Sequence, residues 1–528
     1  MFTNRKLLSA LGLAGLVVGG GAQAAGLVAA GNAFHISGST ALDNQVKDAL
    51  LLPHAAGGPC TAGTISVYTD APVVAGAGNL TKSHQATIVC TTAAAIGTGA
   101  NAIAAGTVVA FTKESNGGSN EGTFYPAAQQ TLAFFDASQT PVGCTNVGAI
   151  AAGTYWTHQQ AIATEFDGCT GTIIQAVPEV GLADEDPALF SVGPQAISPA
   201  LVAKLNTTPL FQNQFAVGVS LDLYRGLQAQ QGLVANDDTL ANMPTLTKAQ
   251  IAALYGGFIT NWNQISSSTG VPLAAGTVFT CRRGDNSGTN VSADAYFLHN
   301  RCTSAGPPMT QVTTTAANCN ALSAGQTPEN NGCHWQASNL TDVTFGGAAG
   351  GDVVSCLDAH SRNGTFAFGP IGATSKFDDP NGASGAATEP GTNHWRYIAI
   401  DGHKPTVEGM ANGTYDYAFD NVENLWTGLT GKSLSVGNFL AALFQSPVAL
   451  TDILVAQTNA QTVAHAVDAN YVTGGLQDAF VGTPNPPPVT VAATNANPVS
   501  AFTLAATGPV NNCQVPLVVG SSISKEVF

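Results

Sequence analysis

The chain has 528 residues, of which only 9% are charged, and its formal net charge is -16. An average soluble protein has roughly 25% charged residues, so neutral polar groups must cover much of this surface, as is common in exported proteins. The negative balance argues against nucleic acid and anionic membranes as partners, because both reward clustered Lys and Arg. It does not exclude a small anion, since a closed site acts through local dipoles and one or two charges.

The N-terminus predicts export. Arg5-Lys6 supply a positive region, residues 7–20 an apolar region, and Ala22-Gln23-Ala24 an A-x-A cleavage site. This combination is typical of a secretory signal peptide, here residues 1–24. No later apolar run reaches the roughly 18 residues needed to span a bilayer. We therefore expect a protein of the periplasm, the extracellular space or the cell surface, without membrane insertion.

The first half of the chain contains two small-residue loops that follow predicted strands. Phe34-His35-Ile36 ends a strand before Ser37-Gly38-Ser39-Thr40, and Leu42, Val46 and Leu50 then recur at helical spacing. Residues 108–111 form a second predicted strand, which leads into a glycine-rich loop at 115–119. Further along, residues 177–184 run from a strand into an acidic turn.

The second half contains a third such loop, at Gly284-Asp285-Asn286-Ser287-Gly288-Thr289. Val278-Phe279 and Arg282-Arg283 precede it as a strand, and Val291, Ala295 and Leu298 share one face of the helix that follows. A Ser-Gly-Thr sequence at a helix start turns N–H groups and hydroxyls toward one small volume, where the helix dipole favours negative charge. The loop is therefore predicted to form half of an oxyanion site.

Other elements of this half are predicted from local patterns. Residues 215–221 are a continuous apolar strand that we expect to cross from the first part of the chain to a second part. Residues 415–422 are the expected return crossing. Thr247 and Gln250 form a capping box ahead of a short helix, which Gly256-Gly257 ends.

The ten cysteines predict disulfides, because an even count is typical of exported proteins. Metal binding is the alternative, but the chain has no C-x-x-C pair and no His cluster at ligand spacing. We therefore expect neither a metal nor a cofactor. The pairs favoured by proximity in the sequence are Cys60 with Cys90, Cys144 with Cys169, and Cys319 with Cys302 or Cys333.

Three segments resemble the phosphate-binding protein of bacterial ABC phosphate transporters. Residues 282–289, Arg-Arg-Gly-Asp-Asn-Ser-Gly-Thr, are similar to the R-x-D-G-S-G-T loop of that family. Residues 254–262 are similar to its I-(F/Y)-x-G-x-I-x-x-W segment, and residues 400–406 to its strand-D-G-x-x-P-T segment. The resemblance spans roughly residues 34–424, and in the N-terminal half it is recognisable only at loops.

The resemblance implies an α/β fold, namely the two-lobed type II periplasmic-binding-protein fold, with disulfide-tied β-rich insertions. Lobe 1 would cover residues 25–221, with insertions at 52–107 and 120–175, and would be completed by a return segment at 416–484. Lobe 2 would cover residues 222–415. Residues 485–528 form a Pro-, Thr- and Ala-rich C-terminal tail.

The resemblance also implies anion ligands in lobe 1. The family's first loop falls on residues 38–41, where Thr40 donates through its hydroxyl and N–H, and Ala41 through its backbone alone. Its second loop falls on residues 115–118, with Ser115 as the donor. Its acidic residue falls on Asp184, which can accept a hydrogen bond from a protonated phosphate.

The third loop would supply the ligands of lobe 2. The implied ligands there are Arg283, Ser287, Gly288 and Thr289. The remaining residue of the motif, Asp285, is expected to hold Arg283 in place rather than touch the anion.

The resemblance therefore implies a monomeric, non-catalytic protein that captures inorganic phosphate between its lobes for ABC-type uptake, with a permease as partner. An alternative stays open, namely a secreted or surface-associated phosphate scavenger or structural protein that works without a permease. The low charge and the cysteine-tied insertions favour it. A hydrolase or phosphatase is disfavoured, because G-x-S-x-G is not formed around Ser287 and no His lies in a recognisable partner motif.

Overall fold

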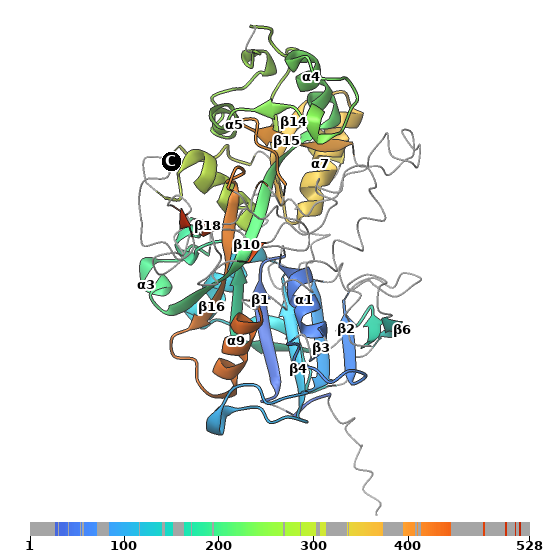
Figure 1. Ribbon diagram of the computed structural model, residues 1–528, viewed down its shortest axis with the longest axis vertical. Helices are drawn as coiled ribbons and strands as arrows, with labels where there is room; N and C mark the ends of the chain where they lie inside the picture. Colours follow the sequence, from blue (N-terminus) through green and yellow to red (C-terminus); the bar gives the residue numbers. More distant parts are fainter. Residues whose placement is uncertain are drawn as a thin grey trace, which may run out of the picture.

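The computed structural model describes residues 27–29, 31–40, 42–52, 54, 57–70, 84–115, 117–139, 143–150, 163–170, 172–192, 195–267, 270–285, 287–302, 307–312, 335, 337–372, 394–406, 409, 413–444, 479–480, 502–503, 513 and 517–518. Within these residues, 15 strands belong to one mixed sheet. Helices accompany it in both halves of the molecule, so the chain is an α/β protein, as predicted (Figure 1). The predicted signal peptide lies outside the described residues.

The lower part of the molecule in Figure 1 is built on one half of this sheet. Its strands are β1 (Ala33–Gly38), β2 (Ile65–Thr69), β3 (Gln85–Thr91), β4 (Val108–Glu114), β6 (Thr145–Ile150), β7 (Ala163–Asp167) and β9 (Val180–Ala183). Its helices are α1 (Asp43–Leu51), α2 (Glu121–Ala128), α3 (Pro199–Val202) and α9 (Gly431–Phe444). Strand β1 runs parallel to both β4 and β9, so the carboxyl ends of these three strands lie at the same edge of the sheet.

The upper part contains the other half of the sheet. Its strands are β11 (Thr245–Leu246), β12 (Phe279–Arg283), β13 (Thr344–Gly347), β14 (Ala367–Gly372) and β15 (Trp395–Ile400). Its helices are α4 (Leu221–Gln231), α5 (Lys248–Tyr255), α6 (Gly288–Ala293), the π-helix η8 (Asp294–Leu298) and α7 (Gly350–Arg362). Strand β12 is parallel to β13 and β14, and the loop after its carboxyl end leads into α6.

Two long antiparallel strands, β10 (Leu205–Ser220) and β16 (Ala418–Trp426), join the two parts (Figure 1). Their register shifts between Pro209 and Gln212, where the short strand β17 (Ala479–Phe480) also pairs with β10. These strands contain residues 215–220 of the predicted outgoing strand and residues 418–422 of the predicted return, and β10 begins ten residues earlier than its apolar run.

The remaining elements are short. Strand β5 (Leu132–Phe135) pairs with β8 (Ile173–Ala176), and β18 (Phe502–Thr503) pairs with β19 (Leu517–Val518). Single 3-10 turns are η3 (Gly99–Asn101), η4 (Gly118–Asn120), η5 (Pro187–Leu189), η6 (Leu240–Asn242), η7 (Trp262–Gln264) and η10 (Ala337–Thr341). No helix among the described residues is long and apolar enough to cross a membrane.

Two large apolar clusters form the core. One lies in the lower part around β1, β4, α1 and α9, and includes Phe34, Phe111 and Leu440. The other fills the upper part around β12, β14 and α7, and extends along β10 and β16 to Leu189 and Phe190. Apolar packing is therefore continuous through the junction between the two parts.

The β-rich segments tied by disulfides extend the main sheet. Strand β3 pairs antiparallel with β4, and β2, β7 and β6 continue the sheet beyond it. Helix α2 lies inside the range expected for the second insertion, yet it packs on the parallel strands: Ser37 Oγ donates to the Glu121 carbonyl at 3.1 Å, and Asn424 Nδ2 donates to the Gly122 carbonyl at 3.1 Å. Residues 121–128 thus belong to the core around the strand ends.

Four disulfides join described cysteines: Cys60–Cys90, Cys144–Cys169, Cys281–Cys356 and Cys302–Cys513. The first two were predicted. Of the two partners expected for Cys319, Cys302 is wrong, because Cys302 bonds Cys513, which is 211 positions away in the sequence. Cys319 and Cys333 lie outside the described residues. Proximity in the sequence fails here because the fold brings Cys513 next to Cys302.

Candidate functional site

The first wall of the candidate site lies where β1 and β9 end. The two strands pair in register from Ile36 opposite Val180 to Gly38 opposite Leu182. Ser39 follows β1, and its N–H donates to the Leu182 carbonyl at 3.0 Å. Its hydroxyl donates to Oδ1 of Asp184, which follows β9. The parallel pairing therefore positions a hydroxyl and a carboxylate from distant segments side by side.

A second hydroxyl reaches the same carboxylate from the end of β4. The chain turns through Gly117 and Gly118 into η4, and Ser119 Oγ donates to Asp184 Oδ2 at 2.7 Å. Both serines and Asp184 are buried. Each oxygen of the Asp184 carboxylate thus accepts a hydroxyl and retains a lone pair for a further donor.

The loop between β12 and α6 packs directly against this wall. A Cβ added at Gly288 would lie 2.2 Å from Asp184 Oδ2 and 2.5 Å from Ser119 Oγ. Only glycine fits at this position, because real Cβ atoms do not approach that closely. Helix α6 continues directly into η8, so the expected helix forms but changes from α to π geometry after Ala293.

Arg283 is the cation of the site. It lies at the end of β12 with 5% of its surface exposed, and its Nη2 donates to the Ala348 carbonyl at 2.6 Å. Its Nε has no hydrogen-bond partner among the described residues. Burial lowers the pKa of Arg283, and the nearby carboxylates of Asp352 and Asp184 act in the opposite direction.

Two adjacent acids have pKa values raised by burial. The pKa of Asp184 is raised by burial, while the hydroxyls of Ser39 and Ser119 and the charge of Arg283 act to lower it. The pKa of Glu185 is raised well above its usual value by burial and by the charge of Asp184. Neither Glu185 oxygen has a hydrogen-bond partner within the described part of the chain, and the charge of Arg301 acts to lower this pKa.

The structure does not direct Ser115 toward Asp184. Its hydroxyl donates to Asp43 Oδ2 at 2.7 Å and to the His84 carbonyl at 3.2 Å. Ser119, four residues later, occupies the position expected for Ser115. The loop 115–119 contains two serines, and sequence matching favoured the one closer to the strand. The turn through Gly117 and Gly118 determines which hydroxyl faces Asp184, and only that glycine pair signals it in the sequence.

Asp285 differs from expectation as well. Its carboxylate pairs with Arg282, at 2.8 Å between Arg282 Nη1 and Asp285 Oδ1, and not with Arg283. Arg282 Nη1 also donates to the Arg283 carbonyl and to Asn290 Oδ1. Successive side chains of a strand point to opposite faces, so the two arginines diverge, and Asp285 lies on the side of Arg282.

The other predicted ligands lie near the same loops. Thr40 follows Ser39 and is half-buried, and Ala41 lies outside the described residues. Ser287 is the N-cap residue of α6, and its Cα is 3.9 Å from a Cβ built at Gly118. Thr289 is buried in the first turn of α6. Ser39 and Ser119 are the two site residues that sequence reasoning missed.

Comparisons with known proteins give matches to solved structures alone. No family model matches the chain, and no curated protein does. A proposed phosphate ABC transporter substrate-binding protein from Clostridium perfringens, solved with bound phosphate, is 15% identical, with a TM-score of 0.37, over 80% of this chain and 96% of that one.

Two further structures are similar over about half of the chain. An ABC-type phosphate transport receptor from Vibrio cholerae is 12% identical, with a TM-score of 0.29, over 52% of this chain and 78% of that one. PstS from Borrelia burgdorferi is 12% identical, with a TM-score of 0.26, over 53% and 77% of the two chains. With these TM-scores, the assignment of the site depends on its own residues.

Proposed function

We propose that this chain is an exported solute-binding protein that captures inorganic phosphate between its two lobes. The observation that carries the proposal is the meeting of Asp184 with Gly288 beside Arg283, because these residues come from the two parts of the molecule. One part contributes hydroxyls and an acceptor. The other contributes the start of a helix and a buried guanidinium whose Nε has no hydrogen-bond partner in the described ranges.

The chemistry of this set suits phosphate better than sulfate. Near neutral pH, part of the phosphate population retains a proton, and a buried carboxylate can accept a hydrogen bond from it. Sulfate offers that carboxylate only lone pairs. A site built around such a bond rejects the analogue that lacks it by roughly 10⁴- to 10⁵-fold. Asp184 is the proposed discriminating acceptor, and Thr40, Ser287, Thr289 and Arg283 are proposed donors.

Capture is proposed to occur by closure of the lobes. Lobe 1 (residues 25–221 and 416–484) carries Asp184, and lobe 2 (residues 222–415) carries Arg283. A ligand that bonds both would favour the closed arrangement by its differential affinity for it. The strands β10 and β16, which cross between the two parts, are the proposed hinge.

Delivery to an ABC permease in the cell envelope is the proposed use of the captured anion. Phosphate uptake by reconstituted vesicles or by intact cells, measured with and without this protein, tests it. Uptake that is unchanged without the protein, while the purified protein binds phosphate, would favour a scavenger that works without a permease.

The binding proposal is tested by isothermal titration of phosphate into protein freed of bound anion, using Arg283→Ala and the matched variant Arg362→Ala. Arg362 is an exposed arginine on α7 paired with Asp358. A hydrogen bond to a charged group contributes about 1.5 to 3 kcal/mol, so Arg283→Ala should weaken binding by about ten- to 150-fold. Arg362→Ala should leave it unchanged. Equal affinities in both variants, or no binding by the wild type, would contradict the proposal.

A further inference from the structure

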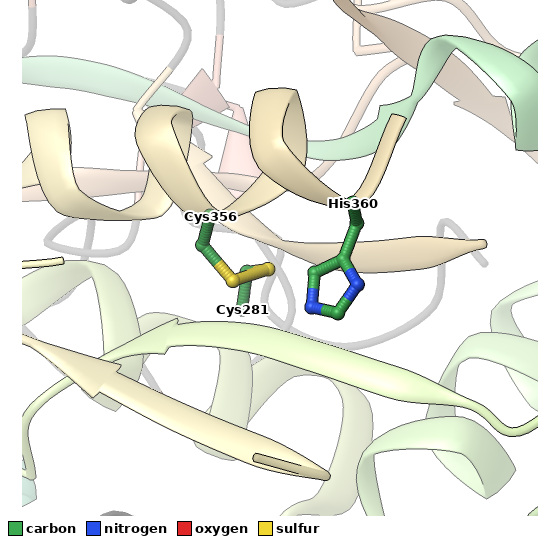
Figure 2. A group of neighbouring side chains, drawn as sticks. All are labelled: Cys281, Cys356 and His360. Atoms are coloured by element: carbon green, nitrogen blue, oxygen red, sulfur yellow. A yellow bond between two sulfur atoms is a disulfide. The ribbon is translucent and has the colours of Figure 1, made fainter. Parts of the chain in front are cut away.

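Three buried side chains that can bind a metal lie close together between β12, the strand that carries Arg283, and helix α7. Cys281 lies in β12, and Cys356 and His360 lie one turn apart on α7. All three are at most 1% exposed. Their candidate ligand atoms lie within 4.8 Å of one another. Figure 2 shows the two sulfurs joined as a disulfide, with the imidazole ring beside them.

Hydrogen bonds determine which nitrogen of His360 is free. The Thr365 hydroxyl donates to the His360 carbonyl at 3.0 Å, so its contact with Nδ1, at 2.9 Å, must be one in which Nδ1–H donates. Burial lowers the pKa of His360 to about 4, so the ring is neutral near pH 7. Nε2 therefore carries the lone pair, and in Figure 2 the ring edge that bears it faces the sulfurs.

We propose that, when the Cys281–Cys356 bond is reduced, the two thiolates and His360 Nε2 bind one Zn²⁺ ion. The reductant is an external dithiol: it supplies two electrons and two protons, its own sulfurs become a disulfide, and the S–S bond of the protein becomes two thiols. Zn²⁺ then replaces the two thiol protons, which pass to solvent. Two Zn–S bonds and one Zn–N bond form, and the fourth position of the ion is left for water.

The charge and polarity of the location favour this ion. Two thiolates and Zn²⁺ sum to zero charge, which suits a site with no exposed ligand, because a net buried charge is costly. Cysteine sulfur and histidine nitrogen are the ligands that zinc prefers. The Nδ1–H contact with Thr365 supplies the outer bond that typically orients a metal-ligating histidine and fixes its tautomer.

The Cys60–Cys90 disulfide provides a control for this proposed zinc site. Among the described residues, the group of Cys281, Cys356 and His360 is the one set of three that combines cysteine, histidine or acidic ligands closely enough to hold an ion. The Cys60–Cys90 bond is equally buried, yet it belongs to no such group. Reduction of that bond should therefore give two buried thiols without a comparable zinc site.

The test compares zinc binding by reduced full-length proteins. Wild type, Cys281→Ser/Cys356→Ser and the matched Cys60→Ser/Cys90→Ser variant are reduced with dithiothreitol, separated from it without oxygen, and titrated with Zn²⁺ against a chromophoric chelator. Co²⁺ in place of Zn²⁺ reports thiolate ligation by its charge-transfer absorption. Wild type and Cys60→Ser/Cys90→Ser should each bind one tight ion more than Cys281→Ser/Cys356→Ser, and oxidised wild type should lack this site.

His360→Gln provides a second variant that keeps both cysteines, so it can fold with the disulfide formed and then be reduced in the same way as wild type. Its reduced form should bind zinc more weakly by at least the roughly 10- to 100-fold that loss of an outer-sphere partner costs. Affinity equal to wild type would overturn the proposal, as would equal zinc stoichiometry in the two double-serine variants. If reduction unfolds the wild type, zinc should restore its near-ultraviolet circular dichroism, and failure to do so would also overturn the proposal.

Discussion

Asp43 and Asp184 are both buried aspartates beside the carboxyl ends of the same parallel strands, but their partners differ in charge. Asp43 lies 2.9 Å from Lys113 Nζ and 3.9 Å from Lys47 Nζ, and it accepts the Ser115 hydroxyl. Within the described part of the chain, the Asp184 carboxylate bonds only the hydroxyls of Ser39 and Ser119.

This difference separates a structural acid from a candidate binding acid. The charge of Asp43 is balanced by cations of its own half of the molecule, and Lys113 also donates to the Gly38 carbonyl at 2.7 Å, which holds the loop after β1. The cations that lower the pKa of Asp184 are Arg283, which comes from the other part and bonds the Ala348 carbonyl, and Lys113. Because Asp184 and Arg283 come from different parts of the molecule, an anion that accepts from Arg283 and donates a proton to Asp184 would bridge the two parts.

The largest expected effect is on the free energy of unfolding, and it tests the structural role of Asp43. Asp43→Ala leaves Lys113 and Lys47 buried beside an empty position, and removing one partner of a buried ion pair costs about 3–5 kcal/mol. Urea unfolding of anion-free protein should show this loss of unfolding free energy. Arg362→Ala, which removes an exposed pair, should cost at most about 1 kcal/mol. A loss of similar size in both variants would mean that Asp43 has no special structural role.

A smaller effect is expected when one serine hydroxyl is removed from beside either aspartate. Ser119→Ala removes a hydrogen bond to Asp184, whereas Ser115→Ala removes one to Asp43. Each bond contributes about 1 kcal/mol. We expect Ser119→Ala to weaken phosphate binding about fivefold, and Ser115→Ala to lower the unfolding free energy while leaving phosphate affinity unchanged. Titration calorimetry and urea unfolding of both variants measure the two quantities, and the reverse pattern would restore Ser115 as the ligand.

The last prediction is a pH dependence of the unfolding free energy that arises in the acidic turn after β9. Burial raises the pKa of Asp186 to about 6. The folded state therefore holds a proton that the unfolded chain releases above about pH 4, so stability from this group is present at low pH and is lost as pH rises toward 6. Relative to Asp186→Asn, wild type should lose unfolding free energy between pH 4 and pH 6 and not between pH 7 and pH 8. A constant difference across this range would contradict the shift.

Local patterns predicted much of the fold. The capping box at Thr247 and Gln250 forms as expected, because its two reciprocal bonds join residues three positions apart. The strand before each loop was also predicted, since apolar runs and glycines mark strand ends. The extension of the main sheet by β2, β3, β6 and β7 was not predicted, because strand pairing is set by contacts between distant segments.

The predicted site residues stay predictions, and the contacts around them that the sequence did not predict are all non-local. Ser39 and Ser119 face Asp184 because three parallel strands end together, and no sequence pattern encodes which of two neighbouring hydroxyls turns inward. Asp285 pairs with Arg282 because alternate strand residues diverge. The Cys302–Cys513 bond joins residues 211 positions apart, which sequence proximity cannot reveal.

The central claim is that Asp184 and Arg283 form the two sides of a phosphate site, and selectivity tests it most directly. The measurement is the calorimetric affinity of wild type and Asp184→Asn for phosphate and for sulfate at pH 7. Asparagine keeps the shape of the side chain and adds a donor, so wild type should prefer phosphate by several orders of magnitude and Asp184→Asn should lose most of that preference. Equal affinity of the wild type for both anions, or an unchanged preference in Asp184→Asn, would contradict the claim.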